Sequence, residues 1–232
     1  MPLVESRDDL YLEYVTLLNL TGACEEALSR ILSRRFHPWE GGEGKVPEQY
    51  IFSCLALGKY ADAFVYPESL GEGKLHGAQE NRQNYLLGLS LGDSEEAKEA
   101  FRRASTGISE PASAMYYNDQ PPETIFYQGM ALLALGEKEE AEKRFDKLID
   151  YADLHRDDHV RIDYFAVSLP DLLVFDEDLD KKNRLHCLFM KALGLYGKGR
   201  KAESRALFEE ALSENPNVFQ IATHYRALFG NE

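Results

Sequence analysis

Long apolar runs, paired cysteines and an excess of basic side chains are all missing from this 232-residue chain. No apolar run approaches the roughly 20 residues that a membrane-spanning helix needs. The segment Met1–Leu20 lacks the basic start and the apolar stretch of a signal peptide. The three cysteines, Cys24, Cys54 and Cys187, lie far apart, as is typical of reduced thiols. We therefore predict a cytoplasmic protein without a membrane span.

Basic residues are outnumbered: the chain has 26 Lys and Arg against 40 Asp and Glu, for a net charge of −14. Binding to a nucleic-acid backbone requires a basic stripe that neutralises phosphates. Anionic membrane surfaces likewise attract clusters of Lys and Arg. Neither nucleic acid nor a membrane is therefore predicted as a partner.

Five glycines are each followed, five residues later, by a small residue, and each pair lies at the centre of a helix-turn-helix pattern. These pairs are Gly22/Ala27, Gly58/Ala63, Gly92/Ala97, Gly136/Ala141 and Gly199/Ser204. The first three glycines are separated by 36 and 34 residues. A glycine at this place ends the first helix in a left-handed turn, which it adopts without steric penalty.

The fourth of these patterns is the most regular. Spacings of four and three place Ile125, Gly129 and Leu132 on one helical face. Gly129 allows two helices to approach closely, because a Cβ atom there would push them apart. Ala141 is the small contact across the helix pair, and Phe145 fills the space beyond it.

This order of residues resembles the tetratricopeptide repeat (TPR), whose period is about 34 residues. The last pattern, from Leu188 to Pro216, resembles it equally well. The resemblance implies an all-α fold: a right-handed α-solenoid of about six TPR-like helix pairs with a C-terminal capping helix. It also implies a surface that holds partners rather than a catalytic pocket.

We predict one repeat domain over residues 1–232, although the glycine spacing widens to 44 and then to 63 along the chain. The last gap is expected to hold a divergent helix pair, with one helix near 157–168. Asn215 and Pro216 are the predicted N-cap and first-turn proline of the capping helix. The predicted units are 8–36, 46–70, 78–106, 122–151, 156–180 (divergent) and 183–214, followed by a cap at 216–229.

First helices line the inner surface of TPR proteins, and the resemblance transfers this role to several apolar side chains of the present sequence. Those predicted to bind a partner are Phe52, Phe126, Met130, Phe189, Leu193 and Tyr196. Lys and Arg are absent from these positions, so a clamp for a peptide's carboxylate is not expected there. An apolar groove suits an amphipathic helix or another domain. In a tight superhelix the same residues would instead form the core.

Trp39, the only tryptophan, lies in the unusual segment Arg35–Lys45 and is added to the predicted partner-binding residues. In that interpretation its ring anchors a partner. In the alternative, the ring packs over the first repeat and the neighbouring glycines simply turn the chain.

No metal site is predicted, although one cluster of histidines has a spacing that metal ligands can have. His155, His159 and Asp163 are spaced by four residues and would share one face of a helix, where they could bind a metal. The nearby Arg156 and Arg161 favour ordinary salt bridges instead.

An acidic run, Asp176, Asp178 and Asp180, imitates the start of a calcium loop. Lys181 replaces the required glycine and Cys187 the terminal glutamate, so the run is interpreted as a solvated turn. Nucleophile motifs built on serine or cysteine are not recognisable either. We predict no catalytic residue and no cofactor.

Three segments, 36–45, 163–171 and 183–187, resemble the C-terminal TPR region of large bacterial proteins. Those proteins carry an uncharacterised N-terminal β-sandwich similar to galactose-mutarotase-like, carbohydrate-active folds. The resemblance implies that this chain is the tail of a longer polypeptide with a role beside sugar metabolism. It transfers no catalytic residue.

The preferred interpretation is a non-enzymatic module that binds a protein, a peptide or the missing N-terminal domain of its own polypeptide. The alternative is an accessory part of a sugar-processing enzyme, in which Trp39, Glu40 and Glu43 complete an active site. A third interpretation is a homodimer formed through the apolar groove.

Overall fold

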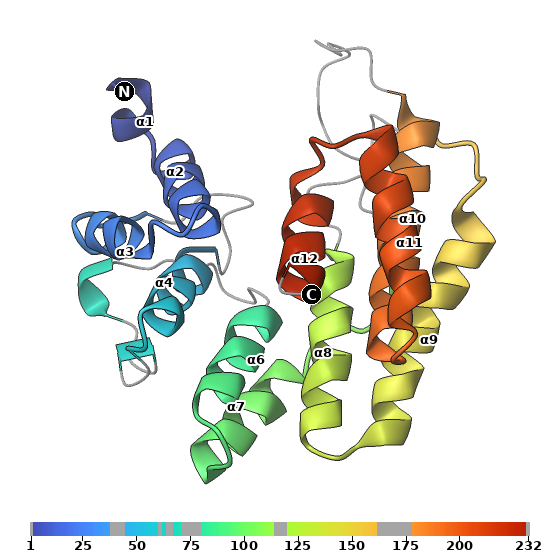
Figure 1. Ribbon diagram of the computed structural model, residues 1–232, viewed down its shortest axis with the longest axis horizontal. Coiled ribbons are helices and arrows are strands. Elements are labelled where there is room, and N and C mark those ends of the chain that lie inside the picture. Colours follow the sequence, from blue (N-terminus) through green and yellow to red (C-terminus); the bar gives the residue numbers. More distant parts are fainter. Residues whose placement is uncertain are drawn as a thin grey trace. The chain divides into compact units, whose positions relative to one another are not determined.

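The computed structural model describes residues 2–37, 45–59, 62–63, 67–70, 80–113, 120–161 and 178–230 (Figure 1). Within these ranges the regular elements are helices, and no strand occurs. The all-α prediction is confirmed, and the fold is consistent with a TPR-like α-solenoid. The handedness and the number of repeats stay predictions.

The chain forms two compact units. Unit 1 comprises Met1–Gly107 and Ala131–Gly136, and unit 2 comprises Ile108–Met130 and Glu137–Glu232. The single domain over 1–232 and its division into repeats stay predictions.

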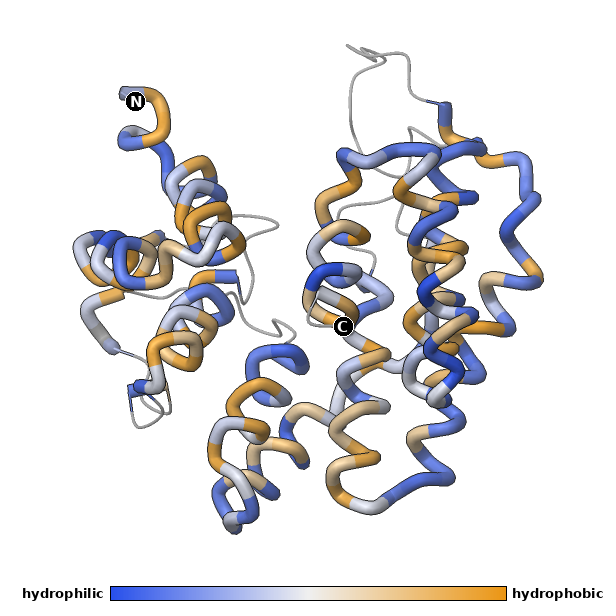
Figure 2. Tube along the Cα trace, in the orientation of Figure 1, coloured by the Kyte–Doolittle hydropathy of each residue, from blue (hydrophilic) through white to orange (hydrophobic). Residues whose placement is uncertain are grey.

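Unit 1 is built from short helices joined as hairpins. They are α1 (Pro2–Ser6), α2 (Asp8–Leu20), α3 (Cys24–Leu32), α4 (Lys45–Ala56), the 3₁₀ turn η1 (Glu68–Leu70), α6 (Asn81–Ser90) and α7 (Glu95–Ala104). Apolar and hydrophilic residues alternate along the helices of this unit, and the apolar ones supply most of its buried core (Figure 2). The core includes Val15, Ile31 and Cys54, all fully buried.

Two polar side chains of unit 1, Asn19 and Arg34, make contacts that join separate segments of the chain. Asn19 is buried, donates to the Gln49 carbonyl at 3.2 Å and accepts from the Ser53 hydroxyl at 2.8 Å, so it ties α2 to α4. Arg34 stands where a TPR usually has a small residue. Its guanidinium lies over the Tyr11 ring and pairs with Asp8 at 2.6 Å, which accounts for a long basic side chain there.

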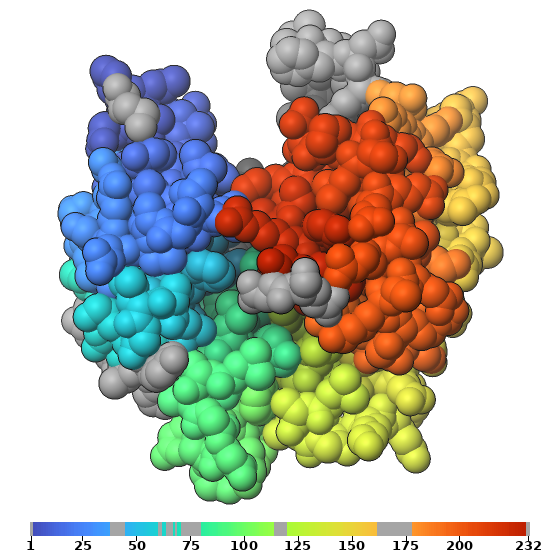
Figure 3. Space-filling view, viewed as in Figure 1, coloured from blue at the N-terminus to red at the C-terminus, as the bar shows by residue number. Residues whose placement is uncertain are grey.

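Unit 2 is built from longer helices. They are α8 (Pro122–Ala134), α9 (Lys138–His155), α10 (Leu179–Gly197), α11 (Lys201–Glu214) and α12 (Phe219–Phe229), with the last turn of α8 grouped with unit 1. Helix α10 packs against both α9 and α11. Helices α11 and α12 are also in contact and share one face of this unit (Figure 3).

The five glycines of the helix-turn-helix patterns all adopt the expected left-handed conformation, with φ between 64° and 86°. They are Gly22, Gly58, Gly92, Gly136 and Gly199. Gly136, for example, follows the end of α8 at φ 84° and donates its amide to the Leu133 carbonyl at 3.0 Å. A non-glycine residue would be strained in this conformation. The turn prediction is therefore confirmed at each of these positions.

The close helix approach at Gly129 is also confirmed. A Cβ atom added to Gly129 would overlap the ring of Phe145 on α9. Phe145 is fully buried, and Ala141, one turn earlier on α9, is buried as well. The glycine and the aromatic ring are thus complementary halves of the contact between α8 and α9.

Two predicted helix starts differ from the structure. The capping helix begins at Phe219 rather than Pro216, because Asn215 is extended and its side-chain oxygen accepts from the Asn217 amide at 3.0 Å, forming a turn. The helix expected near 157–168 is not present over residues 158–161, where α9 has already ended at His155. The rest of that predicted unit, 162–177, lies outside the described residues.

Candidate functional site, a pocket between α10 and α12

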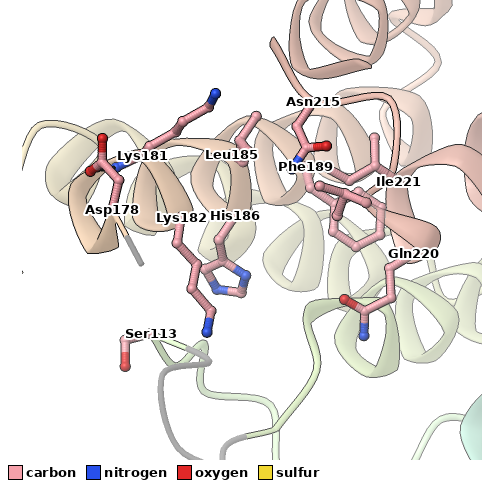
Figure 4. A pocket seen from close by; sticks show the side chains of 11 residues that line it. Ser113, Asp178, Lys181, Lys182, Leu185, His186, Phe189, Asn215, Gln220 and Ile221 are labelled. Carbon is pink, nitrogen blue, oxygen red and sulfur yellow. Dashed lines mark hydrogen bonds between the residues drawn. The ribbon is translucent and has the colours of Figure 1, made fainter. Parts of the chain in front are cut away.

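A pocket of about 400 Å³ lies in unit 2 beside the first half of α10. Its apolar lining comes from α10 and from the start of α12, and consists of Leu185, Phe189, Val218 and Ile221. Its polar lining consists of Ser113, Asp178, Lys181, Lys182, His186, Asn215 and Gln220 (Figure 4). We call this site the C-terminal pocket.

The first turn of α10 fixes the charged groups. Asp178 is the N-cap of this helix, and its carboxylate accepts from the Lys181 amide at 3.0 Å. The Lys181 ammonium donates to the Glu214 carbonyl at 3.2 Å, so it points away from Lys182 (Figure 4). Both groups are thereby engaged in the helix ends around the pocket.

Lys182 and His186 are one helical turn apart and lie side by side, directed toward Ser113 (Figure 4). The Nε2 atom of His186 is 2.8 Å from the carbonyl oxygen of Ala112. Since a carbonyl only accepts, Nε2 carries the hydrogen and donates it. This bond holds the imidazole ring in place at the wall of the pocket.

The floor of the pocket is rigid and apolar. Leu185, Phe189 and Ile221 are buried, and the Phe189 ring is 5.9 Å from the ring of Phe208 on α11. Rings packed edge to face in this way hold one another in a fixed orientation. The pocket therefore combines a polar side that includes Asp178 and two lysines with a preformed apolar surface.

Helix α12 covers the aromatic side chains next to the pocket. His224 lies 5.2 Å from Phe189 and 5.9 Å from Tyr127, measured between ring centroids. Phe229 lies 5.5 Å from Tyr196 and 5.9 Å from Phe208. We call the four rings under α12 the aromatic seat; they are Tyr127, Phe189, Tyr196 and Phe208.

The structure places the predicted partner-binding residues of unit 2 in two environments. Phe126, Phe189 and Leu193 are buried within unit 2, whereas Met130 and Tyr196 are half-buried there.

The Phe126 and Tyr196 rings are brought together, with centroids 6.2 Å apart. Phe52 is half-buried in unit 1, and Trp39 lies outside the described residues. Their role in binding a partner stays a prediction.

Sequence reasoning missed Lys182 and His186. Both continue the stripe of Phe189, Leu193 and Tyr196 toward the start of α10, at the same spacings of three and four residues. Extending the stripe two turns upstream would have found them.

The candidate metal ligands serve other purposes. His155 pairs with Asp158 at 2.7 Å, and His159 with Asp180 at 2.8 Å. The Val160 amide and His159 hold the pKa of the Asp180 carboxyl below its ordinary value. Among the described residues, no group of His, Cys, Asp and Glu is placed to hold a metal ion; Asp163 and Asp176 lie outside them.

The three cysteines are unpaired, and Cys54 and Cys187 are buried. Burial raises the pKa of the Cys187 thiol to about 12, so it stays protonated at neutral pH. A thiol of this kind behaves as a small core residue rather than as a nucleophile. Nor does any helix in the described part of the chain have the length and hydropathy to cross a membrane.

A family model described as "Tetratricopeptide repeat" matches residues 123–153. The matched segment contains most of α8 and α9, including the contact between Gly129 and Phe145. None of the solved structures matches the chain significantly. The family match does not extend to the segments that resemble the carbohydrate-related proteins, so that context stays a prediction. The match, the helical hairpins and the left-handed glycines together support the assignment of this chain as a TPR protein.

Proposed function

We propose that this chain is a non-enzymatic module that binds a helix of another protein, or of a further domain of its own polypeptide. The observation that carries the proposal is the aromatic seat, which already holds one amphipathic helix, α12. TPR repeats generally mediate contacts between proteins, and the α8–α9 hairpin matches that family. The binding surface consists of the seat and of Met130, a half-buried residue about one turn after Tyr127 on α8.

Helix α12 indicates the shape of the helix that fits. Its buried residues are Ile221, His224 and Phe229, which share one face of the helix. Helix-in-groove recognition depends on anchors spaced in this way. A partner helix with large side chains at these spacings would make the same contacts. Helix α12 would first have to dissociate from the aromatic seat.

The chemistry of the described residues supports binding rather than catalysis. The buried thiols are protonated, and the histidines considered as metal ligands pair with single carboxylates. A cytoplasmic location, which the wide spacing of the three cysteines in the sequence favours, is also part of the proposal. A link to carbohydrate metabolism belongs to the proposal only through the predicted resemblance.

A synthetic helix tests the seat directly. A fluorescent peptide of residues 216–230 is titrated with the full chain carrying Ile221→Ser and Phe229→Ser, which weakens α12 in place. Fluorescence anisotropy should show binding at least about tenfold tighter than to the unmodified chain, whose seat is occupied. A peptide with the same two serines is the matched control. Equal binding of both peptides, with circular dichroism showing a folded variant, would contradict a specific seat.

A cellular partner is tested by photo-crosslinking. A photoreactive phenylalanine replaces Met130, beside the seat, and in a control it replaces Leu154, which is 73% exposed on α9. A protein crosslinked at Met130 and not at Leu154 should bind the purified chain. If only the chain itself is recovered, the homodimer interpretation is favoured. Light scattering of Met130→Asp then tests it, since Phe126 is too buried for the same substitution.

A further inference from the structure

We infer that α8, α9 and α10 form a groove for an extended segment of another protein that carries an acidic side chain. The chain's own residues 108–112 occupy this groove in the structure, and we call them the strap. The strap and the side chains that hold it belong to unit 2. None of them is part of the aromatic seat, so this second surface goes beyond the proposed function.

Side chains of the first and third of these helices hold the two ends of the strap. On α8, Gln128 donates from Nε2 to the Ile108 carbonyl at 2.9 Å. On α10, His186 donates from Nε2 to the Ala112 carbonyl at 2.8 Å. Residues 108–113 contain no helix, turn or bend. The strap therefore crosses from one helix to another as an extended peptide would.

The middle of the strap contacts Lys147 of α9. The Lys147 ammonium donates to the Ser109 hydroxyl at 3.2 Å and pairs with the Glu110 carboxylate. Every peptide has backbone carbonyls, whereas a carboxylate at this place depends on the sequence. The groove thus combines backbone recognition, which any extended segment satisfies, with one contact that selects an acidic side chain.

The donor on α8 is oriented before any ligand binds. Gln128 is fully buried, and its Oε1 atom accepts from the Nε atom of Arg144 at 3.3 Å. Because arginine only donates, Nε2 is the atom of Gln128 that faces the strap. Gln120 donates to the same Ile108 carbonyl at 2.7 Å. A buried amide held by a second side chain is preorganised to bind a carbonyl.

The strap itself has no buried anchor. None of residues 107–113 is buried; Ile108 is 61% exposed, and the Glu110 side chain is 73% exposed. The strap is therefore held by hydrogen bonds and an exposed ion pair rather than by the burial of apolar surface. Segments of this kind open at a low free-energy cost. Preorganised donors beneath a weakly held segment indicate a binding site whose occupant can be exchanged.

The strap also indicates the chemistry of the partner segment. Its order is an apolar residue, a hydroxyl, an acid and a proline: Ile108, Ser109, Glu110 and Pro111. Proline and the residue before it both favour extended backbone, so such a segment loses little entropy on binding. The strap continues along the chain at both ends, so the groove accepts an internal segment and does not require a terminus.

Two peptides test the groove on the full ¹⁵N-labelled chain by two-dimensional NMR. The acidic peptide has the sequence of residues 106–113, and the matched lysine peptide carries the substitution Glu110→Lys. In the unmodified chain the strap competes at a high effective concentration. The acidic peptide should therefore bind it with a Kd weaker than about 1 mM.

Charge reversal should open the groove with a defined preference. Glu110→Lys in the chain places two lysines together and should release the strap. The acidic peptide should then bind about fivefold tighter than to the unmodified chain, and about fivefold tighter than the lysine peptide. Lys147→Glu should also release the strap but prefer the lysine peptide. The double variant restores an ion pair and should bind both peptides as weakly as the unmodified chain.

A control for net charge is Glu142→Lys, at an exposed position of α9, which should leave both affinities unchanged. Circular dichroism checks that each variant is folded. If a charge reversal prevents folding, Glu110→Gln replaces it, with a smaller gain expected for the acidic peptide.

Three results would overturn the inference. The first is no shift of the Gln128 side-chain amide when several millimolar acidic peptide is added to the Glu110→Lys chain. The second is equal binding of both peptides to that chain. The third is equal binding of the acidic peptide to that chain and to the unmodified one, which would show that the strap does not compete. None of these results involves α12, so this test and that of the proposed function fail separately.

Discussion

Two helical hairpins of this protein contain the same contact between a glycine and a phenylalanine ring. The surrounding residues enclose the two rings to different extents. Gly88 of α6 faces Phe101 of α7, and Gly129 of α8 faces Phe145 of α9; in both, an added Cβ atom would overlap the ring. Phe145 is fully buried, whereas Phe101 is 8% exposed. A glycine opposite a phenylalanine therefore marks a helix crossing, but it does not by itself determine how rigid the crossing is.

Additional neighbours explain the difference. The Phe145 ring also lies against Gly197 of α10 and 6.3 Å from the Phe126 ring of α8, so two further helices enclose it. The Phe101 ring has Tyr85 of its own hairpin at 6.0 Å, and its contact from α8 is the small side chain of Ala131, which encloses it less completely. Helix α6 is also shorter, with 10 residues against 13 in α8. The family match falls on the better enclosed hairpin.

The largest effect is expected when the rings are removed. Phe145→Ala should lower the free energy of unfolding by about 3–5 kcal/mol, because the cavity is closed on all sides. Phe101→Ala should cost about 2 kcal/mol less, since water can reach that site. Urea unfolding followed by circular dichroism measures both. Equal losses would show that α10 adds nothing to the enclosure of Phe145.

Replacing the two glycines by alanine should destabilise the two hairpins to different extents. Alanine stabilises a helix by about 1 kcal/mol relative to glycine. At Gly129 this gain should be outweighed by overpacking of about 1–3 kcal/mol, because the enclosed Phe145 ring cannot move. At Gly88 the Phe101 ring is less completely enclosed, with 8% of its surface exposed, so Gly88→Ala should be less destabilising than Gly129→Ala. A stabilising Gly129→Ala, measured by urea unfolding, would contradict the tight contact.

The two hairpins also differ in helix capping, and here the second helix of the α6–α7 hairpin has the better cap. The Ser94 hydroxyl accepts from the Ala97 amide at 3.0 Å at the start of α7, whereas Glu137 at the start of α9 makes no side-chain cap bond. Ser94→Ala should cost about 1 kcal/mol, and Glu137→Ala less than about 0.5 kcal/mol. Thermal unfolding of the two variants provides the comparison. A larger loss of stability for Glu137→Ala than for Ser94→Ala would contradict this prediction.

The smallest effect concerns two matching surface pairs, Glu95–Lys98 at 2.7 Å and Glu140–Lys143 at 2.5 Å. In each pair the lysine's hydrogen bond lowers the pKa of the glutamate below its ordinary value. Since the folded pKa is the lower one, the contribution to stability is present above the unfolded pKa of about 4.3 and is lost as the pH falls.

Glu95→Gln and Glu140→Gln should therefore reduce the loss of stability between about pH 6 and pH 3 by equal, small amounts. Urea midpoints across this range measure the change. A clearly larger effect in one hairpin would indicate that its pair is part of a wider charge network.

Local features of the fold were predictable from residues a few positions apart. The left-handed turn at Gly136 and the crossing at Gly129 follow from the conformational freedom and the small size of glycine, whatever the rest of the chain does. The start of α12 was missed by three residues, because Asn215 forms a turn with its own side chain instead of capping the helix.

The candidate site was predictable only in part. Phe189 was expected at a binding surface and does line the C-terminal pocket. Lys182 and His186 were not expected there, because their relevance depends on Ser113 and Ile221, which come from distant parts of the sequence. The apolar stripe of α10 could be found from its spacing, but the helix that covers it could not.

The sequence by itself determined that this protein consists of helical hairpins, since turn glycines and helical spacing act over a few residues. Only the tertiary structure decided which aromatic rings are buried and where a pocket remains. Contacts such as that between His224 and Tyr127 join residues almost 100 positions apart. Such contacts depend on how α12 folds back over α8, α10 and α11, which no short-range pattern specifies.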